Sequence, residues 1–133
     1  MLFGQEHVDR YVETDGEVGH DWRGTKVLIL TTTGRKSGEL RPAPLIYGEH
    51  GGDLMVVASK GGADKPPAWF LNLEATPEVE VQVKGDRFSA RARIANAEEK
   101  PELWRIMTRE WADYDTYQQK TEREIPVVIL ERS

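Results

Sequence analysis

Short apolar runs, most of them bounded by glycine or proline, recur along the chain from residue 26 onward. Runs of this length that are rich in β-branched residues predict strands, because such side chains fit a pleated sheet. Two runs alternate between apolar and polar residues on either side of a Lys84-Gly-Asp-Arg87 turn, which predicts a β-hairpin with one solvated face. The predicted strands cover residues 27–32, 41–47, 54–59, 79–83, 88–94 and 125–131.

Two further segments carry helix signals. Residues 66–75 begin with two prolines and are followed by Pro77, which predicts a short helix, because proline is tolerated in a first turn and stops a helix further on. Asn96, with Glu99 three residues later, has the spacing of a capping box. We therefore predict a second helix that starts near residue 96.

Aromatic residues recur every three positions at Trp111, Tyr114 and Tyr117, a spacing that places them along one side of a helical segment. Such a stripe either fills the core or offers a ligand a flat wall with two phenol hydroxyls. Trp69, in the helix over residues 66–75, has the same two interpretations. The residues alone leave both open.

Together these elements predict an α+β domain shaped like a barrel, with about six mostly antiparallel strands and two or three short helices. Helices do not alternate with strands, which excludes a doubly wound parallel sheet. Pro42 and Pro44 place part of the second strand at a sheet edge, and Pro126 favours an edge start for the last strand. Residues 1–24 are polar, so we predict an N-terminal arm or short helix there and a single domain over residues 25–133.

Composition narrows the class of protein. The 133 residues suffice for one domain with a substantial core, and the net charge of −5 argues against a nucleic-acid partner. The absence of cysteine excludes disulfides and zinc-thiolate sites and suits a reducing cytoplasm. His7, His20 and His50 lack metal-ligand spacing, so we expect no metal. Because no apolar run approaches the ~18 residues of a membrane span, we expect a cytoplasmic protein without an integral membrane segment, and the sequence does not support peripheral membrane association.

Two turns after predicted strands combine glycine, a hydroxyl and cations. The first is Gly34-Arg-Lys-Ser-Gly38, with Arg41 close behind it, and the second is Ala58-Ser-Lys-Gly-Gly62. Glycine lets the backbone come close to a ligand, while N–H groups and cationic side chains bind anions. Each turn is either a solvated connection or part of a ligand site, and both turns could lie at one mouth of the barrel.

Three stretches, TTTGRKSGELRPAPL from residue 31, VVASKGGADKPPAWFLNL from residue 56 and WADYDTYQQKTEREIPVVIL from residue 111, together resemble the deazaflavin-dependent nitroreductase family of F420H2-dependent oxidoreductases. The resemblance runs from about Thr25 to the C-terminus. It implies a split β-barrel, coenzyme F420, and hydride transfer to an electron-poor organic acceptor such as a quinone, an enone or unsaturated lactone, or a nitroaromatic. The expected partner is thus a small-molecule electron acceptor, and the protein is a monomer or a homodimer.

The resemblance also implies roles for single positions. The phosphate and oligoglutamate tail of the cofactor would be held by Arg35, Lys36, Ser37 and Arg41, with Ile29 nearby. The deazaflavin would be lined by Pro42, Ala43, Pro44, Leu45, Ile46, Val57, Ala58, Ser59 and Lys60. Further cofactor contacts would come from Ala68, Trp69, Phe70, Leu71, Asn72 and Tyr114. The catalytic candidates are Tyr114, Tyr117 and Ser59.

Because carbon replaces the flavin N5 in this cofactor, the reduced ring gives two electrons as hydride. We expect Tyr114 and Tyr117 to orient the acceptor or to donate a proton to it, and Ser59 to hydrogen-bond the acceptor or the ring. Trp111 stands where the nitroimidazole-activating member of the family carries tyrosine, so we expect flat apolar acceptors to be preferred to small polar nitroimidazoles.

Two alternatives to this function remain. One is an FMN-dependent split-barrel oxidoreductase, since a flavin phosphate would also suit the basic turn. The other is a noncatalytic protein that binds or carries F420. Three cations at one turn suit a tail with several carboxylates better than a single phosphate, which favours F420 over FMN as the ligand.

Overall fold

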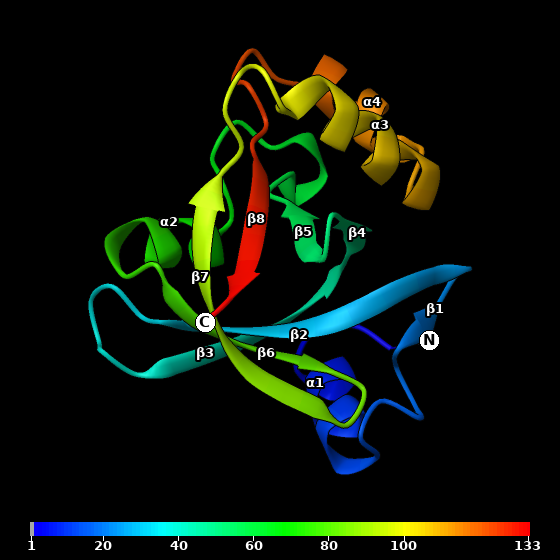
Figure 1. Ribbon diagram of the computed structural model, residues 1–133, viewed down its shortest axis with the longest axis vertical. Coiled ribbons are helices and arrows are strands. Elements are labelled where there is room, and N and C mark those ends of the chain that lie inside the picture. The colour runs from blue at the N-terminus through cyan, green and yellow to red at the C-terminus, as the bar shows by residue number, and fades with distance from the viewer. Residues whose placement is uncertain (1) are drawn as a thin grey trace.

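The computed structural model describes residues 2–133 and has an antiparallel sheet with helices packed around it (Figure 1). The helices are α1 (Gly4–Glu13), α2 (Ala68–Ala75), α3 (Lys100–Glu110) and α4 (Asp113–Gln119), with a 3-10 turn η1 (Lys60–Gly62). The strands are β1 (Asp21–Trp22), β2 (Thr25–Thr33), β3 (Leu40–Ile46), β4 (Gly48–His50), β5 (Asp53–Val57), β6 (Glu78–Val83), β7 (Asp86–Ile94) and β8 (Val127–Arg132). The longest helix, α3, has 11 residues, and across residues 2–133 no helix is long and apolar enough to cross a membrane.

The strands follow the order β1-β2-β6-β7-β8-β5-β4, and β3 pairs with the free side of β2. Every pairing is antiparallel. In Figure 1 the strands β7 and β8 stand across the layer formed by β2, β3 and β6, so the sheet curls. β3 then comes close to β5 without a ladder between them, which leaves the barrel split. The predicted α+β split-barrel fold is confirmed.

The prolines predicted edge positions for two strands, and this prediction is correct for β3 and wrong for β8. β3, which contains Pro42 and Pro44, pairs only with β2 and is an edge strand, as predicted. β8 lies between β7 and β5, so its prediction as an edge strand was wrong. Pro126 stands just before the first residue of β8, where its missing N–H removes no ladder bond.

The central strands bury both faces, which explains their continuous apolar runs. In β2, Leu28 and Leu30 point into the barrel, while Val27 and Ile29 pack against α1. β8 repeats this division: Val128 and Leu130 face the barrel, whereas Val127 and Ile129 face the layer of α3 and α4. The sheet is therefore sandwiched between the barrel interior on one side and helices on the other.

Differences from the predicted elements have local causes. The six predicted strands are present with shifted ends, and the two strands that were not predicted, β1 and β4, are only two and three residues long. The helical alternative for residues 1–24 is confirmed by α1. Trp111 does not share a helix with Tyr114 and Tyr117, because its backbone is extended (φ −147°, ψ 98°) and separates α3 from α4.

The predicted capping box precedes α3. The Asn96 side-chain oxygen accepts a hydrogen bond from the Glu99 amide at 2.9 Å, and the Glu99 carboxylate accepts one from the Asn96 amide at 2.9 Å. These reciprocal bonds satisfy two amides that have no partner within a helix. Regular α-helix begins just beyond, at Lys100.

Candidate functional site

A cavity of about 420 Å³ opens where β3, the end of β5, η1, the start of α2, α4 and the N-terminal segment meet. This volume lies in the range of small-molecule sites, and the walls are mostly apolar and aromatic. The predicted site residues that line it are Pro44, Leu45, Ile46, Val57, Ser59, Lys60, Trp69, Tyr114 and Tyr117. The fold thus brings together residues from five separate segments.

One wall is the loop that follows β5. Lys60, Gly61 and Gly62 all have left-handed backbones, with φ of 46°, 65° and 87°. Glycine adopts such values without strain, whereas Lys60 does not, and strained residues of this kind cluster at functional sites. A Cβ at Gly62 would lie 2.6 Å from the Tyr117 carbonyl oxygen, so glycine lets this loop approach α4 closely.

The same loop is held from behind by Arg123. Its guanidinium donates hydrogen bonds to three backbone carbonyls, of Ala58 (3.2 Å), Ser59 (2.9 Å) and Ala63 (2.8 Å). Bonds from a charged donor to backbone are among the stronger ones in proteins. Ser59 is therefore presented to the cavity from a fixed backbone, although it lies outside regular structure.

The opposite wall carries two phenols. Burial raises the pKa of the Tyr114 hydroxyl above its usual range, so the group stays protonated and can donate a hydrogen bond. The Trp111 Nε1 donates to the Tyr117 hydroxyl at 3.2 Å, which leaves the proton of that hydroxyl for another oxygen. Both interpretations of the aromatic stripe hold in part, because Tyr114 packs in the core and also lines the cavity. Trp69 likewise packs against the core and lines the cavity.

The turn between β2 and β3 lies outside the cavity, and residues 35–41 are exposed. Gly38 has a left-handed backbone (φ 72°), whereas Gly34 does not, and a Cβ at Gly34 would require the Ser37 Oγ, 2.6 Å away, to move. The amides of residues 34, 35, 38 and 39 already donate within the protein. An anion would therefore meet mainly cationic side chains and the amides of residues 36 and 37.

The cations of this turn have different partners. The Arg35 backbone amide and Nη1 both donate to the Asn72 side-chain oxygen, at 3.2 and 3.1 Å, which ties the turn to α2. Arg41 pairs with Glu39 at 3.2 Å. For Lys36, no ion pair or side-chain hydrogen bond is found among residues 2–133. Arg41 and Pro44 both belong to β3 and are three residues apart, so Arg41 lies about 10 Å along the strand from the cavity wall.

Several predicted site residues do not line the cavity: Ile29, Arg35, Lys36, Ser37, Arg41, Pro42, Ala43, Ala58, Ala68, Phe70, Leu71 and Asn72. Ile29 packs beneath α1, while Ala58 and Phe70 lie in the barrel core. Asn72 is buried and donates to the Thr32 hydroxyl at 3.1 Å, so it connects α2 to β2. Contacts between these residues and a cofactor remain predictions.

The N-terminal segment supplies a wall that the sequence did not predict. Phe3 and His7, both from this segment, and Trp22 line the cavity, and the Trp22 Nε1 donates to the Leu2 carbonyl at 3.0 Å. The Trp22 ring lies 5.8 Å from Phe3 and 5.9 Å from Trp111, centroid to centroid. Other lining residues that were not predicted are Leu2, Gly4, Val27 and Pro67. Gly61 and Trp111 also line the cavity, and they belong to the turn and the aromatic stripe that the sequence offered as possible ligand walls. The sequence feature that could have indicated this wall is the presence of aromatic residues in an otherwise polar segment.

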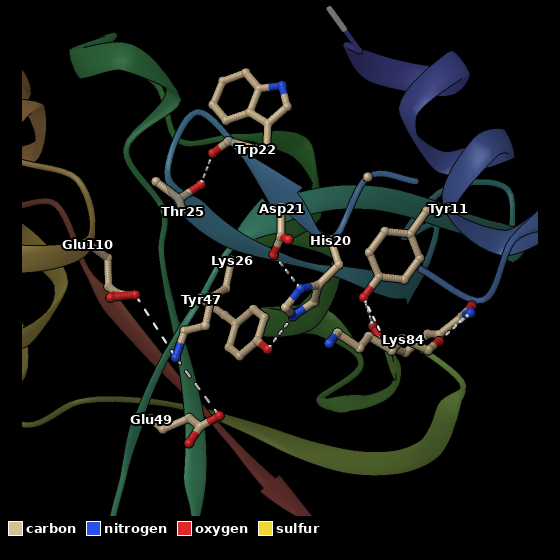
Figure 2. A network of polar contacts seen from close by, with 12 residues as sticks. Tyr11, His20, Asp21, Trp22, Thr25, Lys26, Tyr47, Glu49, Lys84 and Glu110 are labelled. Atoms are coloured by element: carbon tan, nitrogen blue, oxygen red, sulfur yellow. Dashed lines mark hydrogen bonds and ion pairs between the residues drawn. The ribbon is translucent and has the colours of Figure 1, made fainter. Parts of the chain in front are cut away.

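A buried polar network holds this wall to β3 (Figure 2). His20 lies between Asp21 and Tyr47, with its Nδ1 3.0 Å from the Asp21 carboxylate and its Nε2 2.9 Å from the Tyr47 hydroxyl. Burial raises the pKa of Tyr47 to about 12, so the phenol is neutral at ordinary pH. The Thr25 hydroxyl donates to the Trp22 carbonyl at 2.5 Å. These bonds fix the backbone of Trp22 beside the cavity.

Known proteins resemble this chain over nearly all of its length. The family described as F420H(2)-dependent quinone reductase matches residues 3–132. An F420H(2)-dependent quinone reductase of Mycobacterium tuberculosis (strain H37Rv) is 39% identical over 126 residues, which cover 92% of this chain and 85% of that protein. Because the match begins at residue 3, the prediction that the resemblance stops at about Thr25 was wrong.

Two solved structures extend this comparison to the fold. An F420-H2 dependent reductase has a TM-score of 0.73 and 40% sequence identity, over 79% of this chain and 93% of that chain. A chain described as a domain-swapped dimer has a TM-score of 0.77 and 38% identity, over 96% of both chains. The cavity described above thus lies in a fold shared with relatives of substantial sequence identity.

Proposed function

Because the chain belongs to the F420H(2)-dependent quinone reductase family, we propose that it reduces a quinone by hydride transfer from reduced coenzyme F420. The observation that carries this proposal is a cavity with aromatic and small apolar walls and two phenols, joined through β3 to an exposed turn with three cations. A planar ring fits the first part and a polyanionic tail fits the second.

The residues present fit this cofactor in their chemistry. Apolar side chains at residues 44–46 and 57 suit a flat ring, and Trp69 offers a face to pack on it. When bound, the reduced deazaflavin supplies a hydride from its C5. Arg35, Lys36, Ser37 and Arg41 would hold the phosphate and the carboxylates of the tail, with Arg41 exchanging its contact with Glu39 for one with the cofactor.

The acceptor would bind against the phenol wall. Negative charge that arrives on an acceptor oxygen is stabilised by hydrogen bonds from preorganised donors, and the Tyr114 and Tyr117 hydroxyls are such donors. Ser59 offers a third hydroxyl from the loop held by Arg123. The indole faces of Trp22 and Trp111 enlarge the apolar area, which favours flat conjugated carbonyl compounds over small polar nitroimidazoles.

Mixing the purified protein with reduced F420 and a panel of quinones, enones and nitroaromatics tests this function. We expect oxidation of the cofactor that depends on the acceptor, fastest with quinones and slowest with nitroimidazoles. Tight cofactor binding with no oxidation by any acceptor would instead identify a noncatalytic carrier. Equal or tighter binding of FMN would favour the flavin-dependent alternative.

We further propose that the protein acts in the cytoplasm as a monomer or homodimer, and that residues 1–24 form an N-terminal arm packed against a single domain over residues 25–133. The absence of cysteine supports the location, and the similar chain described as a domain-swapped dimer supports a homodimer. Light scattering on the purified protein decides between monomer and dimer. Cofactor binding by a chain that starts at residue 25 tests the division.

A further inference from the structure

His7 projects from α1 and has one ring nitrogen committed to the backbone. Its Nε2 lies 2.8 Å from the Gly19 carbonyl oxygen, and the side chain is 3% exposed. A carbonyl oxygen only accepts, so the proton lies on Nε2 in either charge state of the ring. A Cβ at Gly19 would lie 3.1 Å from Nε2, so glycine at this position leaves room for the ring.

The second nitrogen, Nδ1, has no protein partner among residues 2–133. Within the same residues, no side-chain nitrogen or oxygen is both fully buried and without a hydrogen bond, so Nδ1 is accessible. The space that His7 borders is the cavity. His7 therefore offers a hydrogen-bonding atom to a ligand in the cavity.

His7 ends an arc of rings whose two ends are polar. The His7 and Trp22 rings are 6.3 Å apart, the Trp22 and Trp111 rings are 5.9 Å apart, and the Trp111 Nε1 donates to the Tyr117 hydroxyl. Two indoles thus lie between an imidazole and a phenol. The indole faces suit a flat conjugated ring, and the imidazole can hydrogen-bond an oxygen at the edge of such a ring.

We propose that His7, with a proton on each ring nitrogen, gives the Nδ1 proton to an oxygen of a quinone that is reduced in this cavity; this rests on the proposed function. Two-electron reduction of a quinone needs one hydride and one proton. The quinone accepts the hydride with its electron pair and becomes a hydroquinone anion. The bond between Nδ1 and its proton then breaks, and the proton goes to the anionic oxygen. His7 is left neutral with its remaining proton on Nε2 and the Gly19 carbonyl, and water returns the lost proton.

The other titratable groups around the ring are poorer proton donors. They are Tyr11, one turn along α1, and Lys60, Tyr114 and Tyr117 on the other walls of the cavity. Among the described residues, no carboxylate lines the cavity. Phenols and amines hold their protons at neutral pH, whereas imidazole ordinarily exchanges its proton there.

A pair of acceptors with the variant His7→Gln separates this role from a structural one. The glutamine amide nitrogen can take the place of Nε2 and keep the bond to Gly19, while nothing replaces Nδ1. Reduction of 1,4-naphthoquinone should fall about 100-fold or more, as for loss of a general acid. Reduction of an N-methylacridinium cation, which becomes neutral on taking up hydride and needs no proton, should stay within about twofold. Unchanged quinone reduction, or equal loss with both acceptors, would overturn the proposal.

A second measurement needs neither a variant nor the cofactor. In the wild-type protein labelled with 15N-histidine, anaerobic addition of 1,4-naphthohydroquinone should shift the Nδ1 signal of His7. His20 is the internal control, because both of its nitrogens are bonded within the protein and it does not line the cavity. No shift at His7, or an equal shift at His20, would overturn the assignment. If the wild type reduces neither acceptor, the proposed function fails, and this spectrum still decides whether His7 meets the ligand.

Discussion

The turns at residues 34–38 and 58–62 are alike in sequence and differ in the folded protein. The first is exposed along residues 35–38 and contacts the rest of the molecule mainly through Asn72. In the second, Ser59 and Gly62 are buried, and the backbone is fixed by Arg123 and by the close approach to Tyr117. The comparison shows that elements packed against a turn decide whether its cations meet solvent or its backbone lines a cavity.

This difference in exposure also suggests different roles for the two turns in ligand binding. The exposed cations suit the charged, flexible tail of a cofactor, because long side chains in water can adapt to it. The fixed loop suits the ring and the acceptor, because hydride transfer requires the reacting atoms to be held in place. The predictions below test this division, from the largest expected effect to the smallest.

The phenol opposite the fixed loop should matter most for turnover. Tyr114→Phe keeps the stacking surface and removes the hydroxyl, so turnover should fall about 100-fold, as for loss of a donor that stabilises charge on the acceptor, while cofactor affinity barely changes. Steady-state kinetics and a cofactor titration measure both quantities. Full turnover in Tyr114→Phe, together with unfolding of Tyr114→Ala, would mean that Tyr114 is only a core residue.

Because the fixed loop lies close to α4, replacing Gly61 and replacing Gly62 should have different effects on stability. Gly61 and Gly62 both have left-handed backbones, but only at Gly62 would a Cβ meet another atom within 4 Å, the Tyr117 carbonyl. Overpacking of this kind costs about 1–3 kcal/mol, so Gly62→Ala should lower the free energy of unfolding by about 2 kcal/mol more than Gly61→Ala. Urea denaturation measures it. Equal losses would show that backbone strain alone requires glycine there.

The exposed turn should affect cofactor affinity and leave stability unchanged. Lys36→Ala removes an exposed cation and should weaken F420 binding about five- to tenfold, with a smaller dependence on salt. Arg105→Ala, on the exposed side of α3, is the matched control and should bind as the wild type does. If the two variants bind alike, the turn is an ordinary solvated connection.

The contribution of the Tyr114 hydroxyl to turnover should stay constant over a pH range in which the contribution of an ordinary phenol would decrease. Burial raises the pKa of Tyr114, so its hydroxyl remains a donor as the pH rises past about 10, the usual value for tyrosine. The ratio of wild-type turnover to Tyr114→Phe turnover should therefore stay constant between about pH 7 and pH 10. A ratio that drops within this interval would show that Tyr114 ionises there.

Local patterns in the sequence predicted much of the fold. Alternation across residues 84–87 predicted the hairpin of β6 and β7, and the spacing of Asn96 and Glu99 predicted the cap of α3. Proline placed β3 at an edge. Each of these signals acts within a few residues, where backbone geometry and hydrogen bonding are decided by the sequence itself.

Contacts between distant segments were beyond such signals. Arg123 donates hydrogen bonds to backbone carbonyls within residues 58–63, about sixty positions earlier. Neither stretch has a sequence pattern that predicts this contact. The wall formed by His7 and Trp22 depends on how α1 packs on β2, which is decided by the whole core. The alternation of β2 turns the Ile29 side chain toward α1, the same side as Val27, which lines the cavity; contact between Ile29 and the cofactor stays a prediction.

Fluorescence titration with three ligands tests most directly whether the exposed turn holds a tail while the fixed loop holds a ring. The ligands are F420, the same deazaflavin without phosphate and oligoglutamate, and FMN. The wild type should bind F420 most tightly, and the double variant Arg35→Ala/Lys36→Ala should lose affinity for F420 while its affinity for the tail-free ring stays the same. Equal or tighter binding of FMN by the wild type, or an equal loss of both deazaflavins in the double variant, would contradict the account.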